Sequence, residues 1–581
     1  MLKLEQGTLW LWRLIKRDWG ALLLYFGATI LMTYPVAFKL NTNWVGFYDA
    51  DTYVKLWDNW WITNQLASDT AYFTNVLFYP EGLDLSFHSI SWTAAWMAWF
   101  FDIFVDPISA YNLTILMAVF LTGYGAYLLI FYLIQDQRIA WFGGAIYTFA
   151  PYHVTHTGGH PDLTHLMPIP LAALFLIDAY QNRRWQTAVL SAFCITVAAY
   201  TSFYIMNFAV LTIGVLVLFG MLIDKRWQNK QVWLITAVFS ISVLLLLLPR
   251  LRPIFQNLAS LTEAIELKFA ADVGQSDLRS FITPSHFNPL FRNSVELIAE
   301  RFGMNNKWPA YLGTLPLLLT FIAISWRKEA KQIWPWFAMG LMFLFLALGP
   351  VLRMNGVVFE GFRLSASYLS WFPPIRAVGR PDFFVLGLLL PLAVCASYGL
   401  KRLLPRLTGS KIGQTAFVTL LSTFLLFEYW NGFYQGGELP VSSFFVQLKE
   451  MPEDVAIINL PMGRNQSKPY VYYQTIHEKP ILEGLSARTL PESYTYIREN
   501  RLLSNWHHQK PFDCSRLPDA VFAQSVSQLH NDGFQYIVVH HDIAGNIPEA
   551  LTAYFPMPHH YQDELVTVFK TEDLHLKSSC G

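Results

Sequence analysis

The sequence predicts an α-helical polytopic membrane protein, with about eleven membrane-spanning helices and a C-terminal extracytoplasmic α/β domain. The composition is the first observation: 54% of the 581 residues are hydrophobic and only 14% are charged, more apolar surface than a soluble fold of this length buries. Second, apolar runs long enough to cross a hydrocarbon core of about 30 Å recur up to residue 430. Third, short β-branched runs between polar stretches follow, as in a small soluble domain.

The apolar runs define the expected spans. They are Ala21–Phe38, Ala110–Ile134, Ala140–Ala150, Leu166–Tyr180, Thr187–Ser202, Phe203–Ile223, Val232–Leu248, Ala310–Ser325, Trp334–Leu348, Phe383–Leu400 and Thr415–Trp430. The first follows a basic amphipathic start and precedes no small-residue cleavage pattern, so we expect a signal anchor. The third and fifth runs are short for a span.

Basic residues indicate the orientation of these spans, because short cytoplasmic loops collect Lys and Arg. One cluster lies before the first span, and the others each follow an even-numbered span. They are Lys3–Arg17, Arg138, Arg183–Arg184, Lys225–Lys230, Arg327–Lys331 and Lys401–Lys411. This alternation predicts a cytoplasmic N-terminus and an exported chain after Trp430.

The predicted organisation is a transmembrane domain over 1–430 and an extracytoplasmic α/β domain over 431–581. Two further exported regions, 39–109 and 249–309, are too long to be simple turns, and function is expected in such segments. Strands are expected at Val455–Leu460, Gln535–His540 and Leu565–Phe569. Trp92–Phe104 suits either a helix lying in the membrane interface or one packed under the second span.

Charge and cysteine content exclude several classes. The 41 basic and 41 acidic residues cancel, so no overall field favours nucleic acid as a partner. Cys194 and Cys395 fall in apolar spans, where a thiol packs as a small hydrophobe. Cys514 and Cys580 lie in the tail and could pair if it is exported, which the sequence alone does not decide.

Two carboxylates, Asp49 and Asp51, follow the first span and precede a dense aromatic cluster. A carboxylate near a low-dielectric surface is a suitable general base, and rings such as Tyr53 and Trp57 could form a stacking floor for a substrate. His88, in the same exported region, is a further candidate substrate contact. The alternative is that the aspartates only cap the next helix, which Asp often does.

A histidine-rich segment lies in the next exported loop. It contains His153, His156, His160, Asp162 and His165. Such groups could bind a metal or a phosphate, although histidines that only form hydrogen bonds are the commoner case. A continuous helix is disfavoured by a Gly-Gly-His-Pro sequence inside the segment. His160 and Asp162 are the candidate substrate contacts.

Five arginines on the exported side depart from the positive-inside trend. Arg250 and Arg252 follow the seventh span, Arg279 lies in the second long exported region, and Arg376 and Arg380 precede the tenth span. Guanidinium groups at headgroup depth are well suited to binding phosphate through two parallel hydrogen bonds. The alternative is that they snorkel to ordinary lipid headgroups.

An acidic residue directly after the first span resembles the signature of membrane-embedded glycosyltransferases of the GT-C type, which use polyprenyl-phosphate sugars. More closely, the chain resembles a bacterial branch of that superfamily, and the order of its motifs carries the resemblance. The matching stretches are Asp51–Trp57, Phe78–Pro80, Ala110–Asn112, Gly123–Tyr127, Phe149–His153, Gly159–His160, Phe281–Ser285, Tyr311–Gly313, Leu348–Pro350 and Arg376–Arg380.

The resemblance implies a GT-C-like fold in the bacterial cytoplasmic membrane and transfer of a sugar from a polyprenyl-phosphate or diphosphate donor to a glycan, lipid or protein acceptor. Asp51 takes the position of the family's loop carboxylate, with Asp49 second. That carboxylate either orients the acceptor or ligates a divalent metal such as Mg²⁺ or Mn²⁺, and the sequence does not choose between these roles. The alternative function is a transporter or flippase of lipid-linked glycans, which the scarcity of charge within the spans disfavours.

Overall fold

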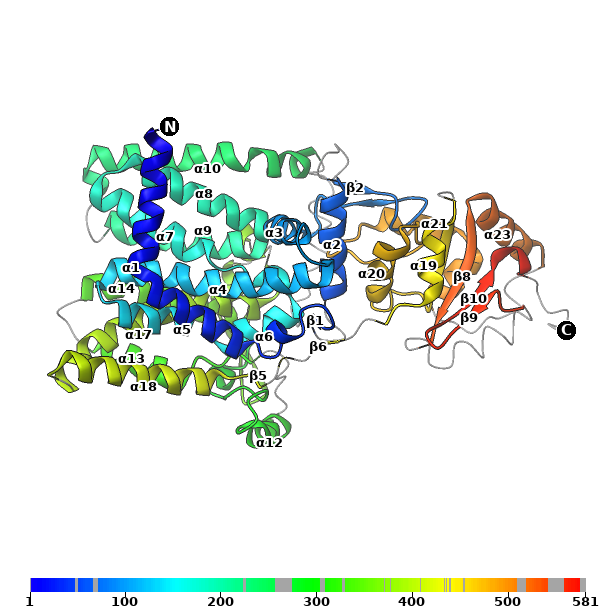
Figure 1. Ribbon diagram of the computed structural model, residues 1–581. Helices are drawn as coiled ribbons and strands as arrows, with labels where there is room; N and C mark the ends of the chain where they lie inside the picture. The colour runs from blue at the N-terminus through cyan, green and yellow to red at the C-terminus, as the bar shows by residue number, and fades with distance from the viewer. Residues whose placement is uncertain are drawn as a thin grey trace. The chain divides into compact units, whose positions relative to one another are not determined.

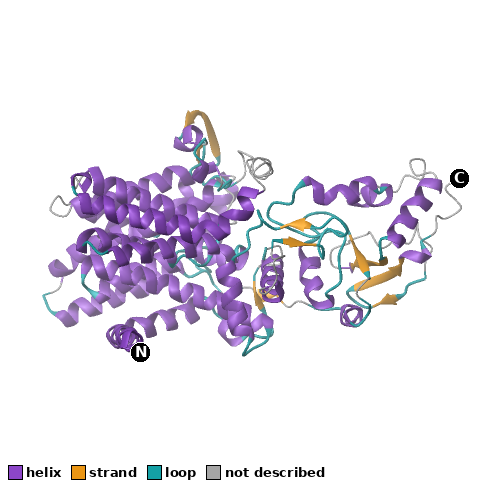
Figure 2. Cartoon of the chain, turned by 90° about the horizontal axis from the view of Figure 1, so that it is seen from above, coloured by secondary structure: helices purple, strands orange, loops and turns teal. Residues whose placement is uncertain are grey.

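The computed structural model describes residues 2–46, 51–65, 72–222, 226–256, 274–302, 309–325, 330–369, 371–376, 378–407, 409–432, 434, 436–437, 440–452, 455–508, 519–541 and 558–574 (Figures 1 and 2). The chain divides into two compact units. The helical unit comprises Met1–Ala50, Ser91–Leu251 and Lys268–Gly437, and the sheet unit comprises Asp51–Ile90, Arg252–Leu267 and Glu438–Gly581. The segment Asp51–Ile90, expected in an exported loop, therefore belongs to the same unit as the C-terminal residues.

Helices account for most of the helical unit, as Figure 2 shows. They are α1 (Leu2–Met32), α3 (Trp92–Asp102), α4 (Pro107–Ile134), α5 (Gln137–Phe149), α6 (Pro151–Gly159), α7 (Pro168–Asn182), α8 (Trp185–Thr201), α9 (Phe203–Leu222), α10 (Lys230–Gln256), α12 (Arg292–Phe302), α13 (Thr314–Ile324), α14 (Ala330–Ala347), α15 (Ser365–Leu369), α16 (Pro373–Arg376), α17 (Phe384–Leu407) and α18 (Lys411–Tyr429). Two strand pairs accompany them: β1 (Trp44–Val45) with β6 (Gly436–Gly437), and β4 (Val351–Met354) with β5 (Val357–Arg363).

Six helices within the described residues are long and apolar enough to cross a membrane. They are Pro107–Ile134, Pro161–Asn182, Phe203–Leu222, Lys230–Arg252, Pro381–Leu407 and Lys411–Tyr429. Three shorter apolar helices, Trp185–Thr201, Thr314–Ile324 and Lys331–Ala347, coincide with three more of the predicted runs. The protein is thus a multi-helix membrane protein by length and composition, and the larger number of spans stays a prediction.

Helix ends follow local chemistry. The helix α1 ends at Met32, short of the expected Phe38, because Pro35 cannot continue a helix. The helix α4 begins at Pro107, three residues before the expected start, and Asp106 caps it by accepting hydrogen bonds from the amides of Ile108 and Ser109 at 3.1 and 3.0 Å.

The helix α17 forms the centre of the helical unit. The apolar part of this helix is fully buried, and it packs against α13, α14 and α5. A Cβ added at Gly399 would lie 1.9 Å from the backbone oxygen of Leu319, so the glycine allows α13 and α17 to approach closely. By contrast, α10 and α18 leave most of their apolar surface exposed, as expected of helices that face lipid.

The aromatic segment within the first exported region forms α3. Trp92, Ala95 and Ala98 are buried where the helix packs against α4 and α8. Trp99 and Phe100 on the same helix are 43% and 53% exposed. One face is therefore packed and the other presents rings of the kind found at the membrane interface.

The sheet unit contains one four-stranded sheet in the order β7-β8-β10-β9, with β7 parallel to β8 and the other pairs antiparallel. Its elements are α2 (Thr52–Gln65), β2 (Phe73–Thr74), β3 (Leu83–Asp84), α19 (Ser443–Lys449), β7 (Ala456–Leu460), α20 (Lys468–His477), α21 (Thr495–Glu499), α22 (Arg501–His507), α23 (Asp519–Asn531), β8 (Phe534–His540), β9 (Tyr561–Gln562) and β10 (Val566–Lys570). The three predicted strands are β7, β8 and β10, shifted by one residue at one or both ends. Cys514 and Cys580, whose pairing the sequence leaves open, lie outside the described residues.

Candidate functional site

The sheet unit holds Asp51, which directly precedes α2. Its side chain is 41% exposed, and one carboxylate oxygen lies 3.5 Å from Nζ of Lys468, the first residue of α20. The helices α2 and α20 pack against each other, so the two charges come together from segments more than 400 residues apart. Asp51 therefore lies at the start of a helix, where a capping role would also place it. Its side chain remains accessible to solvent. Asp49 lies outside the described residues.

The aromatic candidates on α2 are packing residues. Tyr53 is 2% exposed and lies with its ring centroid 6.5 Å from that of Tyr472. Trp57 is 1% exposed, stacks on Trp61, and donates from Nε1 to the side-chain oxygen of Gln474 at 2.7 Å. Their rings fix α2 against α20, and their burial leaves little of them to form a substrate floor.

His88 belongs to a buried polar network. Nδ1 of His88 accepts the amide hydrogen of Ala487 at 3.0 Å, so Nε2 carries the proton and donates to Asp58 at 2.8 Å. Nζ of Lys55 lies 2.9 Å from the other oxygen of Asp58. Burial raises the pKa of Asp58, but the charge of Lys55 and the hydrogen bonds from Lys55 and His88 outweigh it and hold that pKa below its ordinary value. Both nitrogens of His88 are engaged, so the network positions α2.

The helical unit brings Arg380 and Asp382 together before α17. Nη2 and Nε of the arginine donate to the two carboxylate oxygens at 2.8 and 3.2 Å, and the guanidinium lies 4.9 Å from the ring centre of Phe383. A Cβ added at Gly274 would lie 2.6 Å from the Asp382 carboxylate. The backbone at residue 274 can therefore lie this close to the ion pair because the residue is glycine. The arginine side chain keeps 31% exposure and the aspartate 9%.

The histidine segment lies beside this pair. The rings of His156 and His160 are 5.5 Å apart, and each lies less than 6 Å from the ring of Phe383. His153 contacts the backbone oxygens of Thr148 and Thr164 at 2.6 and 2.9 Å through its two nitrogens. His160 therefore lies within the Arg380 cluster, whereas His153 supports the local backbone. Asp162 is 5% exposed in the 3-10 turn after α6.

The remaining predicted arginines are dispersed. Arg250 is 2% exposed and lies 4.9 Å from the ring centre of Phe203. Arg279 donates to the Asn355 side chain at 3.2 Å and stacks over Phe302. Arg252 is exposed near the end of α10, and Arg376 ends the short helix α16 with partial exposure. Arg380 is joined to a buried carboxylate and lies beside the histidine segment.

A divalent metal has no ready site among the described residues. No group of three His, Cys, Asp or Glu side chains comes together there. The pairs that do form, such as Arg380 with Asp382, place a cation beside the carboxylate, which opposes binding of a metal cation.

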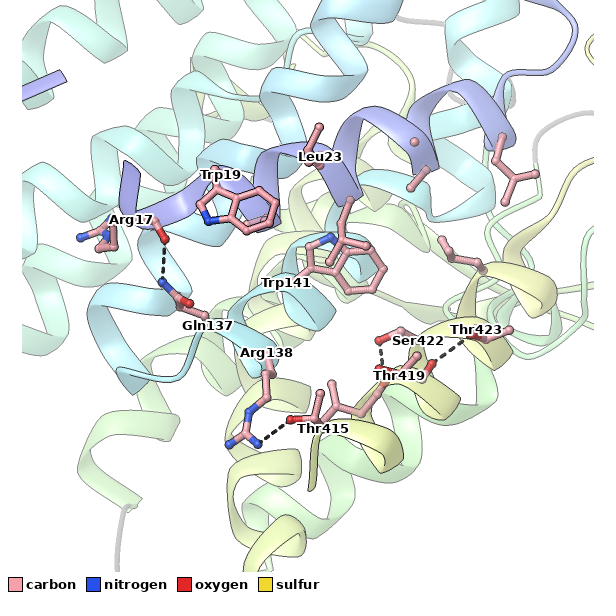
Figure 3. Close-up of a pocket in the computed structure, with 18 residues that line it drawn as sticks. Arg17, Trp19, Leu23, Gln137, Arg138, Trp141, Thr415, Thr419, Ser422 and Thr423 are labelled. Carbon is pink, nitrogen blue, oxygen red and sulfur yellow. Dashed lines mark hydrogen bonds between the residues drawn. The ribbon is translucent and has the colours of Figure 1, made fainter. Parts of the chain in front are cut away.

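A separate groove of about 600 Å³ lies between α1, α5 and α18 of the helical unit (Figure 3). Its walls include Trp19, Leu23 and Trp141. Arg138 at its edge donates to the Thr415 hydroxyl at 3.2 Å. The hydroxyl of Ser422 donates to the backbone oxygen of Val418 in the same helix. None of the predicted site residues lines this groove, so it is distinct from the candidate sites.

Sequence reasoning missed the partners of the predicted residues. Asp382 follows Arg380 by two positions, so the Arg-Pro-Asp sequence could have indicated an ion pair. Lys468 and Gln474 gave no such signal, because they meet α2 only through the packing of α20.

Comparison with solved structures identifies the class of fold. ArnT from Cupriavidus metallidurans, bound to undecaprenyl phosphate, superposes with a TM-score of 0.51 over 96% of this chain and 99% of that chain, at 12% identity. The oligosaccharyltransferase of Archaeoglobus fulgidus, tethered to an acceptor peptide, gives a TM-score of 0.48 over 90% of this chain and 69% of that chain, also at 12% identity. The chain has the fold of the GT-C glycosyltransferases, as the motif order predicts.

The particular family is shown by sequence. The chain belongs to the family described as Domain of unknown function (DUF6311), whose model matches residues 21–422. No curated protein matches the chain.

Proposed function

We propose that this protein transfers a sugar from a polyprenyl-phosphate or diphosphate donor to an acceptor on the extracytoplasmic face of the bacterial cytoplasmic membrane. The observation that carries the proposal is the near full-length likeness in fold to ArnT, a protein solved with undecaprenyl phosphate bound. The fold likeness does not favour the alternative of a transporter or flippase. The acceptor is a glycan, a lipid or a protein.

In this proposal Asp51 is the general base. Its partly exposed carboxylate takes the proton from the acceptor hydroxyl or amine as that atom bonds the anomeric carbon of the sugar. The bond between the anomeric carbon and the phosphate oxygen breaks, and the polyprenyl phosphate leaves with the electron pair. Lys468, 3.5 Å from Asp51, places a positive charge beside the carboxylate before the transfer.

Arg380 is the proposed ligand of the donor phosphate in the helical unit. Asp382 and the ring of Phe383 fix the guanidinium plane, and a fixed guanidinium loses little freedom on binding an anion. No step is assigned to a metal.

The test is an assay of purified chain with a panel of undecaprenyl-phosphate-linked sugars, each with a bacterial envelope extract as the source of acceptors. The proposal expects release of undecaprenyl phosphate with at least one donor and loss of release in Asp51→Asn. Glu81→Gln is the matched control, because Glu81 is an exposed carboxylate of the same segment. Equal inactivity of wild type and variant, together with movement of labelled lipid across proteoliposomes, would favour the transporter instead.

A further inference from the structure

Four parallel segments of the sheet unit end at one edge. Beyond β7 and β8, the backbone at Ile481 bridges in parallel to Ile457 on one side and to Leu77 on the other. The amide of Leu482 donates to the oxygen of Ile457 at 3.1 Å, and the amide of Tyr79 donates to the oxygen of Ile481 at 3.1 Å. Ligands of parallel sheets commonly bind at the carboxyl ends of the strands, so this edge is where a ligand is expected.

A buried carboxylate lies at that edge. Glu483 follows the Ile481 segment, is 5% exposed, and accepts the amide hydrogen of Gly463 at 2.8 Å in the loop after β7. Its other oxygen lies 3.3 Å from Nε2 of His507, whose side chain is 27% exposed. Contact with this carboxylate raises the pKa of the His507 imidazole above its ordinary value. The Glu483 carboxylate thus lies beneath the His507 imidazole, a hydrogen-bond donor that is partly exposed at the surface.

Further donors and a ring surround the carboxylate. The exposed Arg464 is held by the backbone oxygen of Ser486 at 2.6 Å and by the hydroxyl of Thr489 at 3.3 Å. The half-buried ring of Tyr494 lies 5.6 Å from the ring of His507. These groups come from two loops, the 3-10 turn that ends at Tyr494, and α22, and the proposed transfer chemistry does not use them.

We propose that the cluster of Glu483, His507, Arg464 and Tyr494 is a binding site for a carbohydrate. Sugar hydroxyls can accept hydrogen bonds from Arg464 and His507, and Glu483, whose oxygens face Gly463 and His507, holds the imidazole in place from beneath. The apolar face of a sugar ring suits an aromatic wall beside charge-assisted hydrogen bonds. That the site binds a sugar does not depend on the proposed transferase function. That the bound sugar is the glycan acceptor does rest on that function.

The test uses the full chain in detergent on a printed array of neutral and anionic oligosaccharides, without donor lipid. The proposal expects binding to neutral glycans, with affinity reduced about tenfold or more in Glu483→Gln and in Arg464→Gln. The first variant weakens the charge-assisted contact that holds His507, and the second removes a charge-assisted hydrogen bond to the sugar. Glu483→Gln preserves an acceptor for Gly463, and Arg464 is exposed, so neither change should unfold the unit. Glu478→Gln, which breaks the exposed ion pair with Lys449, should bind as wild type does.

The proposal is overturned if wild type binds no glycan on the array, or if both cluster variants bind as tightly as the control. Binding restricted to anionic glycans and displaced by inorganic phosphate would instead define an anion site. Because no donor is present, an inactive transferase leaves the array result unchanged, and the two proposals fail separately.

Discussion

Replacing Asp58 with alanine should destabilise the sheet unit strongly, because it leaves a buried ammonium without its counter-charge. The side chains of Asp58 and Lys55 are 2% and 7% exposed and lie 2.9 Å apart. Nε2 of His88 donates a hydrogen bond to the same carboxylate at 2.8 Å. The network fixes α2, the helix that begins next to Asp51.

The magnitude follows from this burial. Removing one partner of a buried ion pair costs about 3–5 kcal/mol, whereas exchanging both partners for apolar residues of similar volume costs far less. For a unit of this size, such a loss lowers the melting temperature by about 6–20 °C. The double variant Lys55→Met with Asp58→Leu should recover most of this loss.

Thermal unfolding of the detergent-purified variants at neutral pH, followed by differential scanning fluorimetry, measures the effect. Because α2 would lose its anchor, the single variant should also lose transferase activity at temperatures where it remains folded. A fall in melting temperature below about 2 °C for Asp58→Ala would refute the reasoning, since it corresponds to less than 1 kcal/mol.

Three more predictions concern stability and the membrane surface. Burial lowers the pKa values of His477 and His540 to about 3. Between that value and the ordinary 6.5 the unfolded chain binds more protons, so stability falls as pH is lowered, by about 2 kcal/mol per histidine at pH 5. Gly399→Ala should destabilise by about 3 kcal/mol or more, because its Cβ meets the α13 backbone, and melting curves would show this. Phe362, 59% exposed on β5 between the shorter apolar helix α14 and the candidate membrane helix α17, should lie in the lipid interface. A fluorescent amino acid placed there should be quenched by brominated lipids.

Each of these predictions has a control. The melting temperature of the double variant His477→Gln with His540→Gln should depend less on pH between 5 and 7 than that of wild type, and an unchanged dependence would contradict the assignment. Gly214→Ala, where an added Cβ meets nothing within 4 Å, should melt no lower than wild type. The same fluorescent residue at the exposed Glu572 should resist brominated lipid, and equal quenching at both positions would count against an interfacial hairpin.

The helical part of the fold was largely predictable because apolar length is a local property. Pro35 moved the end of the first helix and Asp106 moved the start of the next, both by chemistry that can be read in sequence. Strands β7, β8 and β10 were found from β-branched runs. The inclusion of Asp51–Ile90 in the sheet unit was not predictable, since it depends on α2 packing against α20.

The candidate site was predictable only in part. The position of Asp51 follows from its place after the first apolar run, but its contact with Lys468 depends on tertiary structure. Tyr53 and Trp57 were expected to face a substrate because aromatic residues often do so near a membrane, yet their rings are buried. Burial depends on what covers a helix, and no local pattern in α2 reports that.

The rate of undecaprenyl phosphate release with the best donor of the panel, compared between wild type and Asp51→Asn, tests the central claim most directly. A general base contributes about 10²–10⁴-fold, so the variant should be slower by at least about 100-fold with its melting temperature unchanged. A folded Asp51→Asn variant that releases the lipid within tenfold of the wild-type rate would contradict the assignment of Asp51 as the base.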